Sequence, residues 1–101
     1  MSILTLERDP LAVDLTLTNE HFMVALADGR SLTVPLAWYP RLTQATESEL
    51  AQWRLLGGGY AIEWPALDEH IGIAALLAGH PSGESEASWN RWIATRSSGM
   101  P

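Results

Sequence analysis

The chain has 101 residues, enough for one hydrophobic core and too few for two ordinary domains. Hydrophobic residues make up 47% and charged residues 18%, a balance that is globular and excludes a disordered chain. There is no cysteine, which excludes disulfide scaffolds, thiolate metal sites and cysteine nucleophiles. The formal charge of −6 does not suit a phosphate backbone; it suits a basic protein partner, or simply solubility.

The N-terminal segment gives no targeting signal. It has neither a basic region nor a long apolar region, as a signal peptide would. No window approaches the ~20 apolar residues that span a bilayer. We therefore expect a cytoplasmic protein with no membrane association and no direct contact with nucleic acid.

Three alternating segments come first in chain order. The segments 13–17, 22–26 and 32–36 place an apolar residue at every second position, the period of a half-buried strand. We expect an antiparallel meander with one strongly apolar face, and we assign Val13 to that face.

The connections between these segments predict the register. A two-residue turn at 19–20 pairs Leu17 with Phe22, so the apolar faces coincide. A three-residue loop at 27–29 does the same for the second pair of strands. Gly29 stands where such a loop needs a left-handed residue.

A short helix is predicted next. Thr46 and Glu49 have capping-box spacing, which predicts a helix over 47–54 with Trp53 on its apolar side. The glycines at 57–59 then break the chain.

A fourth strand and a second helix complete the predicted domain. Alternation over 60–64 indicates the strand, and Asp68 is placed to cap a helix over 69–78. The predicted fold is α+β, in the order β-β-β-α-β-α, with a mainly antiparallel four-stranded sheet and helices on one face.

The C-terminal segment predicts an amphipathic helix over 87–97. Ser85 is its expected N-cap, and Trp89, Trp92 and Arg96 fall on one face. So short a helix is unstable alone in water, so it must dock either on this chain or on another. We divide the chain into a compact domain (1–79), a linker (80–86) and this docking helix (87–97).

Several motifs together resemble a known family. They are DGR at 28–30, PLAWYPRL at 35–42, IEWPALDEHI at 62–71 and LLAG at 76–79. The chain resembles the small bacterial family called domain of unknown function 2442 over most of residues 12–96. His70 departs from the family, which often has an Asp-x-Asp pair at 68–70.

The resemblance implies a binding protein. Members are encoded beside short proteins, in pairs suspected of being toxin–antitoxin systems. The resemblance therefore implies an antitoxin-like binding module. Together with the acidic charge and the lack of a convergent acid–base set, we expect a non-enzymatic module that neutralises or scaffolds a small basic protein encoded by a neighbouring gene. The alternative is a homo-oligomeric structural module without a toxin partner. Two copies would then pair through the C-terminal segment or through the strand face of Met23, Ala25 and Ala27.

We expect no catalytic site, no metal site and no cofactor. Consecutive helix residues point about 100° apart, so 68–70 would not converge on an ion or a substrate. His21, His70 and His80 lack metal-ligand spacing. The glycines at 57–59 follow a helix and lead into a strand, unlike a phosphate-binding loop.

Aromatic anchors and acidic residues are the expected partner contacts. Trp38 lies in an irregular segment between prolines, where it could form an interface or cover the core. The candidate contacts are Trp38, Tyr39, Trp89, Trp92 and Arg96, with Glu63, Asp68 and Glu69 as an acidic rim.

Overall fold

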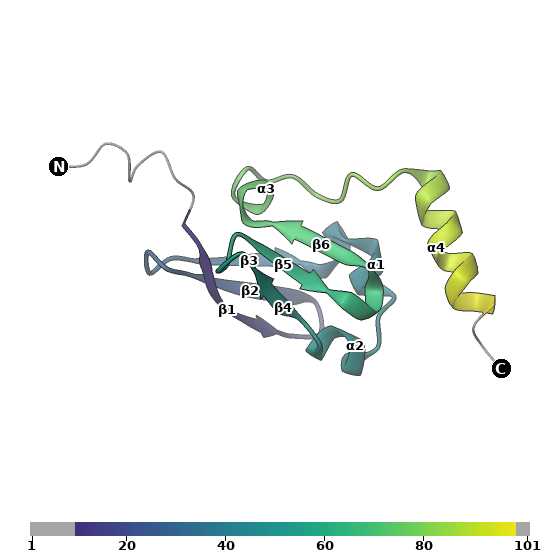
Figure 1. Cartoon of the computed structure of the whole chain (residues 1–101), viewed down its shortest axis with the longest axis horizontal. Helices are drawn as coiled ribbons and strands as arrows, with labels where there is room; N and C mark the ends of the chain where they lie inside the picture. Colours follow the sequence, from purple (N-terminus) through teal and green to yellow (C-terminus); the bar gives the residue numbers. More distant parts are fainter. Residues whose placement is uncertain (1–9, 99–101) are drawn as a thin grey trace.

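Two three-stranded antiparallel sheets form the centre of the molecule (Figure 1). The computed structural model describes residues 10–98. The first sheet consists of β1 (Ala12–Leu17), β2 (His21–Leu26) and β3 (Ser31–Pro35). The second consists of β4 (Arg54–Leu56), β5 (Ala61–Trp64) and β6 (Glu69–Gly72).

Short helices connect the strands, and a longer helix ends the described chain. The elements between the sheets are η2 (Leu36–Trp38), α1 (Pro40–Thr43) and α2 (Glu47–Ala51). The later ones are η3 (Pro65–Leu67), α3 (Ile73–Leu77) and α4 (Glu86–Ser98). An extended segment leads from α3 to α4, which lies at one end of the molecule (Figure 1). Residues 12–77, with both sheets and α1 to α3, are called the body below.

The predicted register of the first sheet is confirmed. Leu17 pairs with Phe22, and Val24 pairs with Leu32. Gly29 has a φ of +94° in the β2–β3 loop, a conformation that glycine adopts without steric cost.

The assignment of Val13 to the apolar face was wrong. The pairing of β1 with β2 shifts between Ala12 and Asp14, as in a β-bulge. Ala12 is buried there, and Val13 is 57% exposed. An extra residue in one strand reverses the alternation on one side of the bulge, which period-two spacing cannot reveal.

The predicted single four-stranded sheet was also wrong, because β4 and β6 were missed. The α2 helix keeps the predicted capping box but ends at Ala51. The chain then forms a hairpin, in which β4 pairs with β5 across the glycines at 57–59. Trp53 lies between α2 and β4 and packs against the core.

The predicted helix over 69–78 was wrong in its first half. Residues 69–72 form β6, in which Ile71 pairs with Ile62, and only Ile73–Leu77 is helical. Asp68 is not an N-cap: it has a φ of +51° and ends η3. Strand pairing with β5 and the poor helix propensity of Gly72 outweigh the helical pattern here.

The two sheets meet through aromatic side chains. Phe22 and Trp64 form an edge-to-face contact with ring centroids 5.7 Å apart. The indole of Trp64 donates a hydrogen bond of 3.0 Å to the carbonyl of Leu50. The largest fully buried side chains are Trp64, Phe22, Leu42, Ile62, Leu67, Ile73 and Val24.

A close backbone contact also joins the sheets. The N–H of Ala12 donates to the carbonyl of Gly59 over 2.8 Å. A Cβ on Gly59 would lie 2.2 Å from the carbonyl oxygen of Ala12. Glycine at position 59 therefore allows the β4–β5 hairpin to approach β1.

Candidate partner-binding cleft

The segment between α3 and α4 is held against the body. The hydroxyl of Tyr39 donates to the carbonyl of His80 over 2.9 Å. The N–H of Ser82 donates to the carbonyl of Trp38 over 2.9 Å. The predicted linker at 80–86 thus has fixed contacts with the η2–α1 region.

Arg41 of α1 connects this segment to the second sheet. Its guanidinium binds both carboxylate oxygens of Glu84, with an Nε–Oε1 distance of 2.9 Å. It also donates to the carbonyls of Leu67 and Asp68 over 3.1 and 3.0 Å. The Arg41 side chain is only 12% exposed, and a planar guanidinium is well suited to such simultaneous bonds.

The Glu84 carboxylate is stabilised in its charged form. The hydrogen bonds from Arg41 hold the pKa of Glu84 below its ordinary 4.5, and the Ser88 hydroxyl lowers it further. Ser88 belongs to α4 and donates over 2.7 Å. Glu84 therefore links the first turn of α4 to α1.

The C-terminal helix docks on its own chain. Its predicted N-cap is present, because the N–H of Ser88 donates to the Ser85 hydroxyl over 3.1 Å. The guanidinium carbons of Arg41 and Arg96 lie 5.0 and 4.8 Å from the ring centroid of Trp92, within cation–π range. Trp92 also packs against the core.

Arg96 attaches the next turn of α4 to α2. Its guanidinium binds both carboxylate oxygens of Glu49 at 3.0 and 3.1 Å and donates to the carbonyl of Gln44. These bonds lower the pKa of Glu49 below its ordinary 4.5. Trp92 and Arg96 were expected as partner contacts, and both are engaged within the chain.

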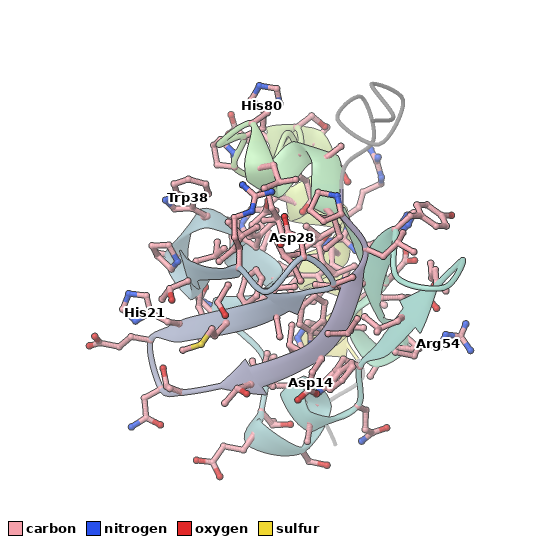
Figure 2. All side chains as sticks on the ribbon, turned by 90° about the vertical axis from the view of Figure 1, so that its left-hand side faces the viewer. Asp14, His21, Asp28, Trp38, Arg54 and His80 are labelled. Atoms are coloured by element: carbon pink, nitrogen blue, oxygen red, sulfur yellow. The ribbon has the colours of Figure 1, made fainter. Side chains whose placement is uncertain are left out.

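The start of α4 forms one wall of an open cleft of about 650 Å³. Trp38 from η2 and Trp89 from α4 both line it, and both are half-buried. Trp38 projects on the side of the molecule opposite to Arg54 (Figure 2). The other principal residues of the cleft are Pro40, Pro81, Glu84 and Glu86.

Tyr39 is not part of this surface. It is 4% exposed, and its ring centroid lies 6.1 Å from that of Phe22. Burial raises the pKa of the Tyr39 hydroxyl. The expectation of a partner contact at this position was therefore wrong, and Tyr39 instead anchors the segment after α3.

The expected acidic rim does not surround the tryptophans. Glu63 lies on β5 and pairs with Arg54 over an Nε–Oε1 distance of 2.6 Å. Asp68 and Glu69 line a second hollow of about 400 Å³ beside Arg41, which shares Pro81, Ser82 and Glu84 with the tryptophan cleft. Glu69 is partly buried, and this burial raises its pKa. The neighbouring Asp68 side chain is 99% exposed. The acids at the tryptophan cleft are Glu84 and Glu86, which the sequence did not single out.

A larger cleft, which shares Ala37 with the tryptophan cleft, was not foreseen. It measures about 760 Å³ and separates the β1–β2 turn from α1 and α2. Its walls come from segments up to 34 positions apart, from Leu17 to Ala51, so no local pattern marks it. The apolar part includes Leu17, Leu36, Leu42 and Leu50, and the acids are Glu20 and Glu47.

The histidines are spread over the surface. His21 and His80 are well separated (Figure 2), and His70 lies on β6. Within the part of the chain that the structure describes, no three histidine or acidic side chains are grouped to hold a metal ion. No described helix combines the length and apolar character needed to cross a bilayer.

The fold is similar to that of two solved structures. One is the crystal structure of a protein of unknown function from Rhodospirillum rubrum, with 24% identity and a TM-score of 0.66 over 79% of this chain and 96% of that chain. The other is the solution NMR structure of an uncharacterized protein from Chromobacterium violaceum, with 20% identity and a TM-score of 0.64 over 93% of this chain and 82% of that chain. A comparison with curated proteins gives no match. The model of the family described as "Protein of unknown function (DUF2442)" matches residues 12–82, a span that holds both sheets and ends before α4, and the chain belongs to this family.

Proposed function

We propose that the protein is a non-enzymatic, antitoxin-like binding module that neutralises or scaffolds a small basic protein encoded by a neighbouring gene. The observation that supports this most strongly is the cleft between Trp38 and Trp89. Trp38 and Trp89 are both partly exposed in this cleft, and tryptophan is among the side chains that most often dominate protein–protein affinity.

The surface charge favours a basic partner. Four arginines of the described region, at positions 30, 41, 54 and 96, form ion pairs with acids of this chain. The carboxylates of Glu20, Glu47 and Glu86 form no ion pair with any described residue. Glu86 lines the tryptophan cleft, and Glu20 and Glu47 line the larger cleft beside the β1–β2 turn. Such acids would speed association with a positively charged protein.

The proposal is tested by co-expression with the product of the adjacent gene. The tagged chain should capture that product, and Trp89→Ala should reduce capture at least about tenfold, the usual effect of losing a hot-spot side chain. Tyr60→Ala is the matched control, because Tyr60 is 54% exposed on another part of the body. Equal capture by all variants, or no capture by the parent chain, would refute the proposal.

A homo-oligomeric module is the second candidate, and the outer face of the first sheet favours it. Val13 and Met23 are 57% and 43% exposed there. Single exposed apolar residues are common on monomers, so this observation is weaker than the tryptophan cleft. A concentration-independent dimer in sedimentation equilibrium that Met23→Lys converts to a monomer would favour this candidate over the first.

A further inference from the structure

The tryptophan cleft combines an aromatic wall with carboxylates. Trp38 and Trp89 contribute rings, Pro40 and Pro81 contribute flat apolar surface, and Glu84 and Glu86 contribute negative charge. Glu84 is already bound to Arg41, whereas Glu86 has no ion pair among the described residues. The cleft therefore offers one uncommitted carboxylate beside two rings.

The same helix shows what such rings bind. One turn beyond Trp89, the ring of Trp92 has the guanidiniums of Arg41 and Arg96 within 5.0 Å of its centroid. Trp89 lies next to Trp92, with ring centroids 5.4 Å apart and planes inclined by 31°. In the described part of the chain, no guanidinium lies over Trp89 or Trp38 in the same way.

The chain has no lysine, and its described arginines at the α4 contact are committed to acids of the same chain. Arg91 of α4 forms no ion pair among the described residues, but neither it nor any other described arginine lines the Trp38–Trp89 cleft. The cleft is therefore open to a cation from another molecule. An aromatic face attracts a cation through the ring quadrupole, and a planar guanidinium also stacks on it. A nearby carboxylate adds a charge-assisted hydrogen bond.

We propose that the Trp38–Trp89 cleft binds an arginine side chain of the basic partner. The guanidinium stacks on the indole of Trp89 and pairs with Glu86, and its alkyl chain lies against Pro40 and Pro81. This inference rests on the proposed function and identifies the chemical group that the partner presents.

The test uses the full chain and a short blocked peptide, acetyl-Gly-Arg-Gly-amide, followed by the indole N–H signals in ¹⁵N–¹H NMR spectra. The Trp38 and Trp89 signals should shift in a saturable manner in the millimolar range expected for one side chain. The Trp64 signal should stay in place, because that indole is buried and bound to Leu50.

Two matched peptides separate charge from shape. Replacing arginine by citrulline removes the charge and keeps the shape, and should weaken binding at least about threefold, as expected for loss of a cation–π contact. A lysine peptide should also bind more weakly than the arginine peptide. Equal binding of citrulline, or of lysine, would overturn the assignment to arginine.

The protein variants give a second line of evidence. Glu86→Gln changes an exposed residue outside the core. It should weaken binding of the arginine peptide about threefold or more, because a charge-assisted hydrogen bond is lost. An unchanged affinity in this variant would remove Glu86 from the site. If the arginine peptide causes no shift while the neighbouring gene's product is still captured in a Trp89-dependent way, the arginine inference fails and the proposed function stands.

Discussion

Arg41 and Glu84 are 43 positions apart in the sequence and form a two-pronged ion pair at the junction of the body, the segment after α3 and α4. The two side chains are only 12% and 13% exposed. The same guanidinium reaches the backbone of the β5–β6 connection and the ring of Trp92. This pair therefore fixes the position of α4, and with it the wall of the cleft that Trp89 provides.

Replacing Glu84 by glutamine should destabilise the docked helix. The change leaves the Arg41 guanidinium largely buried with a weaker partner, which typically costs about 1.5–3 kcal/mol. Amide hydrogen exchange should accelerate across α4 in this variant. Glu63→Gln is the control, because its partner Arg54 is 65% exposed, and such surface pairs contribute about 1 kcal/mol or less. Equal losses in the two variants would contradict a special role for the Arg41–Glu84 pair.

Acid should release α4 before the body unfolds. The pKa values of Glu84 and Glu49 are lowered by hydrogen bonds from Arg41 and Arg96. Their stabilising effect is therefore complete above the ordinary carboxylate pKa of 4.5 and is lost as the pH falls through the lower folded values. The ratio of the amide exchange rate in α4 to that in β2, measured at each pH, should rise below about pH 4.5.

The double variant Glu49→Gln, Glu84→Gln provides the reference for this pH dependence. It has no carboxylate to protonate at either contact, so α4 exchange relative to β2 should change little over the same range. A parent chain with an equally flat profile would show that these ion pairs do not hold the helix. The effect of Glu69 on stability has the opposite pH dependence. Burial raises the pKa of Glu69, so its ionisation lowers the free energy of unfolding as the pH rises above 4.5.

The approach of the hairpin to β1 predicts unequal effects at neighbouring glycines. Gly58 and Gly59 both have positive φ values, of +76° and +120°, so alanine is strained at each, typically by about 1 kcal/mol or more. Only at Gly59 does the added Cβ also meet the Ala12 carbonyl oxygen, at 2.2 Å. Gly59→Ala should therefore lower the free energy of unfolding by at least about 1 kcal/mol more than Gly58→Ala. Equal midpoints in urea denaturation would contradict this close contact.

The two tryptophans of α4 should differ in their effect on stability. Trp92 packs against the core and receives two guanidiniums, so Trp92→Ala should cost about 2–4 kcal/mol, near the lower end for large aromatic truncations. Trp89→Ala should cost about 1 kcal/mol, the typical value for a partly exposed site. Thermal melting followed by circular dichroism compares them. A larger loss for Trp89 would place that ring, rather than Trp92, at the docking contact.

The first sheet was largely predictable from the sequence because its register depends on short turns. The loop ending in Gly29 and the turn at 19–20 are local, and each fixes which side chains face each other. The capping box of α2 and the N-cap of α4 were predictable for the same reason. Val13 was the exception, because a β-bulge depends on the partner strand.

The second sheet and the cleft depend on contacts between distant segments. Residues 69–72 form a strand because they pair with β5, although their local pattern suits a helix. Trp38 and Trp89 were each singled out, but their position in one cleft depends on Arg41. Arg41 lies in the family motif at 35–42, but that motif does not reveal its role, because its hydrogen-bond partners lie 26 to 43 positions away.

The docking of α4 on its own chain is tested most directly by nuclear Overhauser effects from the Trp92 indole. In a monomeric sample at neutral pH, the ring protons should show contacts with the side chains of Arg41 and Arg96. A mixture of isotope-labelled and unlabelled chains should show no such contacts between molecules. Contacts that appear only between labelled and unlabelled chains, or a Trp92 signal at its random-coil position, would contradict this docking.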